Sequence, residues 1–493
     1  MSFFSSNFLL FIVVLFAVYY GIVRIFPEYQ WCVLLTASVF FYAYSNLQYL
    51  IFLFVSIMST WLFPLLMKKR GGKLKGLCLA LCLLINIGLL IALKYHNFFL
   101  RIFDKHISWI LLPLGISYYT FQSAGYCIDV YRGIVEPERN FLKYALYISF
   151  FPQISQGPIG TYQELAPQFF APHTFTYTQF TSGLERAVLG FFKKVVVANN
   201  LSAAVNPIYD NFSVYSGFTL FFVTVLYGLQ LYADFSGYMD IALGLSECMG
   251  IRLAENFQTP YFSKSVTEFW RRWHISLGEW FRNYLYYPVL RTNTVLALGR
   301  KIKRSGQKKL AKYTTTSIGL LVTWIVIGFW HGAAWKFAAY GLFHGTMIIM
   351  NVWLGNLYKA VRDRLHIQKN SKLWALFQMV RTYLIVNIGY VLFRADSFRT
   401  ALAIYRIIFT KFFSGGFWIT MAGFSRSYWI LLGIALLFLL AVELLEERCG
   451  FLEWLDKRPL FIKWPILYFM IAFVMLYLFN QQADAMNFIY FDF

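Results

Sequence analysis

Long apolar runs recur along almost the whole chain and are separated by short polar stretches. Many approach the length that a helix needs to cross a hydrocarbon core, about 20 residues. Backbone polar groups find no water in lipid, so we expect the runs to be helical. They are Phe8 to Ile22, Trp31 to Tyr44, Tyr49 to Met67, Leu77 to Leu93, Trp109 to Val130, Ala145 to Ile154, Leu184 to Ala198, Gly217 to Leu245, Ile318 to Trp330, Gly341 to Leu354, Leu373 to Phe393, Trp429 to Leu445 and Trp464 to Phe479.

Several runs are short or broken, so we predict about 9 to 12 true crossings together with re-entrant and interfacial helices. Composition agrees with this class, because 59% of the 493 residues are hydrophobic and only 14% are charged. Charged residues make up about a quarter of ordinary soluble domains. No long linker interrupts the pattern. We therefore predict an all-α polytopic helical bundle around a central cavity, forming one membrane domain over residues 1–493.

A helix breaker interrupts one apolar run, in the order Ser-Gln-Gly-Pro-Ile-Gly over residues 155–160. Such a break at membrane depth is tolerated only beside a cavity or inside protein. Polar side chains also occur within neighbouring apolar runs. We expect four of them, Gln122, Gln153, Gln156 and Asp234, to line the cavity or to bind substrate.

The formal net charge of +21 resides mainly in loops between the apolar runs. The basic loops are Lys68 to Lys75, Arg300 to Lys312 and Arg362 to Lys372, and by the positive-inside rule they face the cytoplasm. Anionic lipid or a phosphate-bearing cytosolic ligand fits this distribution better than nucleic acid. The six cysteines are scattered without CxxC spacing, so the sequence predicts neither a disulfide framework nor a metal site.

Two histidines interrupt the apolar run from Ser317 to Met350, namely His331 and, thirteen residues later, His344. An ionisable side chain at membrane depth is costly, so its default interpretation is a functional site. His331 is the first candidate. A straight helix would place His344 about 220° around and about 20 Å along from His331. The two can share a site only if the helix breaks near Gly332, and otherwise His344 is structural.

The segment from Phe269 to Leu290 interleaves tryptophan, tyrosine and arginine, which is typical of a helix at the membrane interface. Arg271, Arg272 and Arg282 could bind the phosphates of a donor, since a guanidinium matches that geometry, or could contact only lipid headgroups. His274 lies among the same aromatic residues. It is either a functional group or a solvated, stacked side chain.

Six motifs follow one another between about residues 112 and 393. They are Leu112-Pro-Leu-Gly-Ile-Ser-Tyr-Tyr-Thr-Phe-Gln, Ile128-Asp-Val-Tyr-Arg-Gly, Phe150-Phe-Pro-Gln-Ile-Ser-Gln-Gly-Pro-Ile, Phe269-Trp-Arg-Arg-Trp-His-Ile-Ser-Leu, Gly328-Phe-Trp-His-Gly and Tyr340-Gly-Leu-Phe-His-Gly. Together they resemble the bacterial membrane-bound O-acyltransferases. Within that family the chain looks most similar to the alginate O-acetylation branch, with the teichoic acid D-alanyl transfer branch as its sister.

The resemblance implies an enzyme in which a cytosolic acyl thioester meets an acceptor hydroxyl from the outside at an intramembrane histidine. The essential histidine of the family corresponds to His331, and a second retained one to His274. His344 matches a third, whose role is less clear. We expect no bound cofactor, because the donor, acetyl coenzyme A or an acyl carrier protein, is a co-substrate.

The chemistry suits these positions, because an imidazole within hydrogen-bond reach can take the proton of a sugar hydroxyl as the thioester carbonyl is attacked. The chain has no Gly-x-Ser-x-Gly elbow, which favours direct transfer over a covalent serine intermediate. His331 is thus expected to be the general base.

The expected function is transfer of an acetyl group to hydroxyls of an extracytoplasmic cell-surface polysaccharide, at the bacterial cytoplasmic membrane. The resemblance also implies a separate extracytoplasmic esterase-like transferase as partner. One alternative keeps the fold and moves D-alanine from a carrier protein to teichoic acid. An alternative from another class is a transporter or flippase in which the histidines relay protons.

Overall fold

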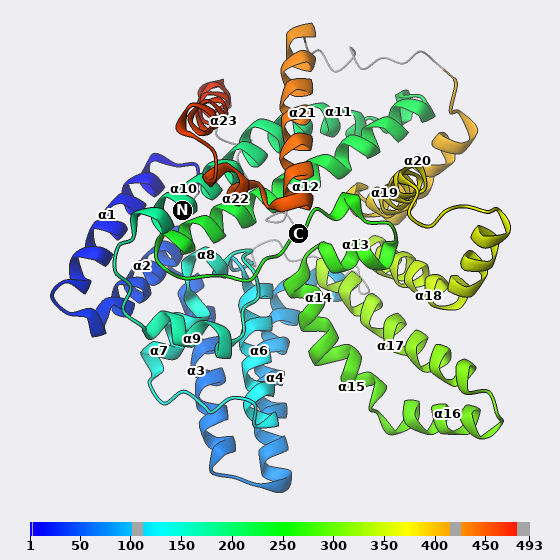
Figure 1. The fold of residues 1–493 in the computed structure, drawn as a ribbon. Coiled ribbons are helices and arrows are strands. Elements are labelled where there is room, and N and C mark those ends of the chain that lie inside the picture. Colours follow the sequence, from blue (N-terminus) through cyan, green and yellow to red (C-terminus); the bar gives the residue numbers. More distant parts are fainter. Residues whose placement is uncertain (2, 101–111, 415–424, 481–493) are drawn as a thin grey trace. The chain divides into compact units, whose positions relative to one another are not determined.

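The computed structural model describes residues 1, 3–100, 112–414 and 425–480, and helices dominate these ranges (Figure 1). They contain no β-strand, only one isolated antiparallel bridge between Phe257 and Trp273. Ten of the described helical stretches are long and apolar enough to cross a membrane. The prediction of an all-α polytopic protein is confirmed, and the ten candidates lie within the expected range. The first residues of the run from Trp109 fall outside the described residues.

The chain forms two compact units, each assembled from separate stretches. The first comprises Met1–Val196, Asp234–Glu255 and Cys449–Phe493. Within it, α3, α4 and α6 pack against one another, and α2 packs against α1 and α7 (Figure 1). Its helices are α1 (Ser6–Val23), η1 (Pro27–Tyr29), α2 (Gln30–Ser45), α3 (Tyr49–Lys68), α4 (Gly72–Lys94), α5 (His96–Leu100), α6 (Ile116–Arg132), α7 (Phe141–Ser149), α8 (Phe151–Ile154), α9 (Tyr162–Phe170), α10 (Tyr177–Phe191), α22 (Phe451–Asp456) and α23 (Leu460–Asn480).

The second unit comprises Val197–Ala233 and Asn256–Arg448. Among the described helices, three continue from one unit into the other: the π-helical η3 (Phe192–Ala198), the long helix α12 (Gly217–Cys248) and α21 (Arg426–Cys449), whose last residue belongs to the first unit. The remaining helices are α11 (Asn199–Asp210), η4 (Phe212–Val214), η5 (Pro260–Phe262), α13 (Val266–Arg272), α14 (Ile275–Phe281), the π-helical η6 (Arg282–Tyr286), α15 (Tyr287–Leu290), α16 (Asn293–Arg304), α17 (Lys308–His331), α18 (Trp335–Arg364), α19 (Lys372–Arg394) and α20 (Phe398–Thr410).

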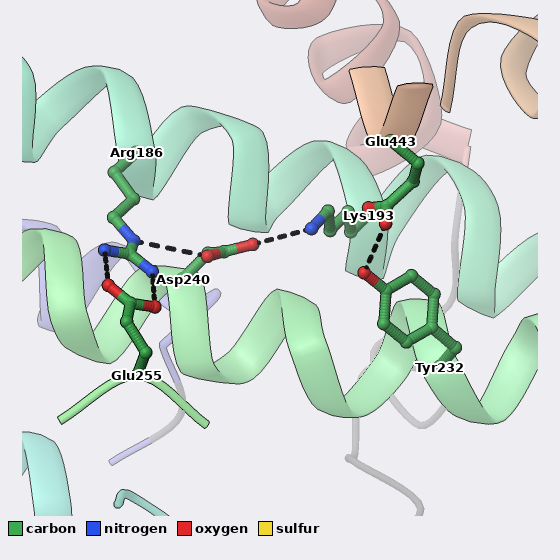
Figure 2. A network of polar contacts seen from close by, with 6 residues as sticks. All are labelled: Arg186, Lys193, Tyr232, Asp240, Glu255 and Glu443. Carbon is green, nitrogen blue, oxygen red and sulfur yellow. Dashed lines mark hydrogen bonds and ion pairs between the residues drawn. The ribbon is translucent and has the colours of Figure 1, made fainter. Parts of the chain in front are cut away.

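Charged side chains meet inside the first unit. Asp240 of α12 accepts hydrogen bonds from Arg186 Nε at 3.2 Å and from Lys193 Nζ at 2.9 Å. Arg186 also donates to both carboxylate oxygens of Glu255, at 2.7 and 2.6 Å (Figure 2). A charge at membrane depth is tolerated when it is paired within protein. This network therefore pairs the charged side chains that α10, η3 and α12 carry into the apolar unit.

The second unit has a smaller polar contact on the same long helix. Tyr232, near the middle of α12, donates a hydrogen bond to Glu443 of α21 at 2.7 Å (Figure 2). Both side chains are buried. Because a buried carboxylate without a donor is costly, this bond fixes the contact between the two helices.

The break expected at residues 155–160 is confirmed, since α8 ends at Ile154 and α9 begins only at Tyr162. The segment from Phe269 differs from the expectation of one interfacial helix. It divides into α13 and α14, because His274 adopts a left-handed backbone conformation with φ of 47°. The preceding residue, Trp273, forms the isolated bridge with Phe257, which holds the chain extended at this point.

The apolar run that carries two histidines is a helical hairpin. Helix α17 ends at His331, residues 332–334 are extended or bent, and α18 begins at Trp335. The two helices lie side by side over much of their length (Figure 1). Their approach depends on small residues, because a Cβ atom on Gly341 would lie 2.1 Å from the backbone oxygen of Trp324. The predicted condition for a shared site, a helix break near Gly332, is thus met.

Candidate active site

His331 lies at the carboxyl end of α17 and is buried. Three aromatic rings surround its imidazole in the second unit. The centroid of His331 lies 4.9 Å from that of Trp330, 5.2 Å from that of Phe393 and 5.8 Å from that of Tyr340. These rings come from the ends of α17 and α19 and from the second turn of α18. They form an apolar wall that keeps bulk water from the imidazole.

His274 occupies the residue before α14 and is buried to 3% exposure. Its ring lies 6.0 Å from the ring of Trp330, measured between centroids, so Trp330 contacts both His274 and His331. Burial lowers the pKa of His274 to about 3, from an ordinary value of 6.5. The side chain is therefore a neutral imidazole throughout the physiological range.

His344 lies on α18 and is fully buried. Trp270 donates its indole hydrogen to Nδ1 of His344 at 3.4 Å, and the Tyr340 centroid lies 4.6 Å from that of His344. Gly389 of α19 leaves the space that the ring occupies, since a Cβ atom there would lie 2.3 Å from Nε2. Tyr340 thus contacts both His331 and His344, and the hairpin brings the two histidines together.

The three histidines therefore share one aromatic cluster, although each comes from a different stretch of the second unit. A neutral imidazole carries one lone pair and one hydrogen, so it can accept a proton at one nitrogen while the other donates. A site of this kind can remove a proton from a hydroxyl and later return it. Among the described residues, no group of three histidine, cysteine, aspartate or glutamate side chains could hold a metal ion.

The structure places the three candidate arginines differently from one another. Arg272 donates to Glu447 at 2.6 Å and pairs with Glu268 at 2.9 Å. Its guanidinium is thus already engaged by carboxylates, which reduces its capacity for a donor phosphate. Arg282 pairs with Glu279 at 2.9 Å in a half-exposed contact. For Arg271, which is exposed, no ion pair occurs among the described residues.

The three candidate glutamines belong to the first unit and are buried. Gln122 donates to the backbone oxygen of Tyr147 at 2.7 Å, and Gln153 donates to that of Pro158 at 2.8 Å. Gln153 thereby braces the break at residues 155–160. The carboxamide of Gln156 has no hydrogen-bond partner among the described residues. Their roles in lining a cavity or binding substrate remain predictions.

Asp234 forms a buried ion pair with Lys194, a residue that was not among the predicted site residues. Its carboxylate accepts a hydrogen bond from Lys194 Nζ at 2.5 Å, and both side chains are 2% exposed. The attraction between two opposite charges in contact offsets part of the cost of burying them. Asp234 therefore has a structural partner, whatever else it contacts.

Sequence reasoning also missed Asn256, Tyr340 and Phe393. Asn256 contacts His274 from a polar loop whose composition carried no signal for a site. Tyr340 lay inside a quoted motif but was not singled out from the many aromatic residues. The two adjacent lysines at residues 193–194 could have indicated a buried ion pair, because charges inside an apolar run are rare.

Comparisons with known proteins identify the family of this chain. The model of the family described as MBOAT, membrane-bound O-acyltransferase, matches residues 137–393. The chain is 34% identical over 453 residues to a probable alginate O-acetylase AlgI of Azotobacter vinelandii, covering 88% of this chain and 83% of that protein. It is 32% identical over 414 residues to a peptidoglycan O-acetyltransferase of Helicobacter pylori, covering 77% and 73%. A teichoic acid D-alanyltransferase of Streptococcus thermophilus is 32% identical over 261 residues, covering 51% and 60%.

Proposed function

Because this chain belongs to the membrane-bound O-acyltransferase family, and is therefore an acyltransferase, we propose that it transfers acetyl groups to hydroxyls of a cell-surface polysaccharide. The relatives that support this proposal carry names of alginate and peptidoglycan O-acetylation, and they align with most of the chain. The ten apolar helices agree with a multi-pass membrane protein. We place it in the bacterial cytoplasmic membrane, with its basic loops inside.

We propose that His331 is the general base. The single observation that carries this role is its position, buried at the break between α17 and α18 and enclosed by Trp330, Tyr340 and Phe393. The imidazole removes the proton of the acceptor hydroxyl as the oxygen attacks the thioester carbonyl. The carbon–sulfur bond then breaks, the acyl group stays on the oxygen as an ester, and the thiolate takes the proton from the imidazolium.

The donor in this proposal is a cytosolic acyl thioester, either acetyl coenzyme A or an acyl carrier protein. Positive charge on the basic loops raises the local concentration of such polyanionic donors. The acceptor hydroxyl arrives from the extracytoplasmic side. A separate extracytoplasmic esterase-like transferase completes the delivery to the polymer.

Gene deletion tests the proposal. Surface polysaccharide from wild-type, deletion and complemented cells is treated with mild base, and the released acids are identified by mass spectrometry. Loss of ester-linked acetate in the deletion strain, with recovery on complementation, is the expected result. Unchanged acetate in the deletion strain would contradict acetyl transfer by this protein.

The second candidate function is D-alanyl transfer to teichoic acid. It rests on the similarity to the streptococcal D-alanyltransferase, which covers about half of this chain, 51%. The same experiment separates the two candidates, because loss of ester-linked alanine instead of acetate would favour D-alanyl transfer. If the protein were a transporter or flippase, the deletion strain would lose transport across the membrane, and acyl transfer would persist.

A further inference from the structure

The carboxamide of Asn256 is the centre of a small buried network beside His274. Its Oδ1 accepts hydrogen bonds from the backbone nitrogen and the hydroxyl of Ser276, both at 3.0 Å, and lies 3.3 Å from Nδ1 of His274. The three side chains are all buried, with 1% exposure for Asn256. The backbone oxygen of Asn256 also accepts from the nitrogen of Ile275 at 3.0 Å.

This network determines which way the carboxamide faces. A backbone N–H can only donate, so the Asn256 atom that meets the Ser276 nitrogen must be the oxygen and not the amide nitrogen. The same oxygen faces Nδ1 of His274. An oxygen acceptor requires a hydrogen on the nitrogen opposite, so Nδ1 of His274 is protonated. In a neutral imidazole the lone pair then resides on Nε2.

Asn256 also replaces the ordinary cap of α14. The residue before a helix usually supplies its own side-chain oxygen to an early N–H of that helix. His274 occupies this position and makes no such bond, and Asn256 supplies the oxygen to Ser276 from twenty residues upstream. The His274 side chain is thereby released from capping, so its ring can lie against Trp330.

The backbone supports a functional interpretation of this arrangement. His274 is one of three non-glycine residues with positive φ among the described residues, at 47°. Such conformations are strained and cluster at functional sites. The bridge between Phe257 and Trp273 holds the residue before His274 in an extended conformation.

We propose that Asn256 is a positioning residue of the acyltransferase: its carboxamide oxygen holds His274 in the Nδ1–H tautomer, which makes Nε2 the nitrogen that accepts a hydrogen bond from a second hydroxyl of the acceptor, beside the one whose proton His331 takes. This inference rests on the proposed function for its substrate, whereas the tautomer itself rests on the network alone. The ring of Trp330 contacts both His331 and His274, so an acceptor that binds beside this ring lies near both imidazoles.

The tautomer is measured by ¹⁵N NMR of histidine-labelled, full-length protein in lipid nanodiscs, with His274→Gln used to assign the His274 signals. We expect the Nδ1–H tautomer in the wild-type protein and in Asn256→Asp, which retains an oxygen acceptor. Asn256→Ala should lose this preference. An Nε2–H tautomer in the wild-type protein, or an unchanged tautomer in Asn256→Ala, would overturn the proposal.

Kinetics provide the second measurement. Removing the group that orients an active-site histidine lowers turnover, and we expect kcat of Asn256→Ala to fall at least about tenfold with a smaller change in KM. Asn256→Asp should recover much of the loss. Asn86→Ala removes an asparagine of equal burial, 1% exposed, from the first unit, and should leave the His274 tautomer unchanged. Equal loss of kcat in Asn256→Ala and Asn256→Asp would contradict the role of the oxygen acceptor.

Failure of this inference and failure of the proposed function are distinguishable. If the wild-type protein transferred no acyl group, the proposed function would be wrong, but the NMR measurement would still report the tautomer. If transfer occurred and the tautomer did not depend on Asn256, only the inference would be wrong.

Discussion

The imidazole of His331 meets the ring of Tyr340 edge-on, with the two centroids 5.8 Å apart and the two planes at 89°. Tyr340 lies on the helix that follows the break at Gly332, and it also contacts His344. The α17–α18 hairpin therefore brings together two histidines that a straight helix would separate by about 20 Å. The break between α17 and α18 thus lets both helices contribute side chains to the candidate site.

Substituting Gly389 by alanine should disturb His344. The new Cβ atom would lie 2.3 Å from Nε2 of His344, so the ring or α19 must move. Overpacking of this kind costs about 1 to 3 kcal/mol. We expect a lower melting temperature for the purified protein and reduced acyl transfer. Gly355→Ala in α18 is the matched control, because a Cβ atom there has no neighbour within 4 Å; equal effects of both variants would refute the argument.

The buried ion pair between Lys194 and Asp234 predicts a non-additive pair of substitutions. Removing one partner leaves a charge in a site that is 2% exposed, which costs about 3 to 5 kcal/mol. Lys194→Met and Asp234→Leu should each lower the melting temperature strongly. The double variant should recover most of the loss, since an apolar pair replaces the charges.

The control for this prediction is the pair between Lys68 and Glu136, whose side chains are 46% and 80% exposed. An exposed ion pair contributes little to stability, so Lys68→Ala should leave the melting temperature nearly unchanged. Additive losses in the Lys194 and Asp234 double variant would show that the two charges do not compensate each other.

The fold class could be predicted from the sequence because side chains that face lipid must be apolar, so the hydropathy pattern marks the membrane-spanning helices. Apolar runs of spanning length predicted the bundle, and the cost of an ionisable group in lipid singled out His331. The partners of buried polar groups were not predictable in the same way. Arg272 pairs with Glu447, which is 175 residues away, and composition alone does not reveal that carboxylate.

The division at His274 was equally hidden, because it arises from a bridge between two loops and from a strained backbone conformation. Local propensity in this segment favours a continuous helix. The contacts of Trp273 and Asn256 override it, and these contacts form only in the folded chain. Functional sites are where such conflicts between local and tertiary preference are expected.

Stability of the protein should depend on pH through His274. The unfolded chain has the ordinary histidine pKa of 6.5, whereas burial lowers the folded value to about 3. Below pH 6.5 the unfolded state therefore binds more protons, and stability falls as pH falls towards 3. At pH 5 this loss amounts to about 2 kcal/mol.

Thermal unfolding of wild-type protein and His274→Gln at pH 7.5 and pH 5 measures this effect. The variant lacks the titrating group, so its melting temperature should fall less between the two pH values. Identical pH dependence of the two proteins would show that burial does not lower the pKa of His274 in the folded protein.

The most direct test of the central claim is the ester-linked acyl content of the surface polysaccharide in cells carrying His331→Ala at membrane levels matched to wild type. Loss of the general base should slow transfer by about 10²-fold or more. We therefore predict acyl content as low as in the deletion strain, while His366→Gln, an exposed histidine substitution, retains the wild-type content. Wild-type acylation in His331→Ala would contradict the account and make His331 a structural residue.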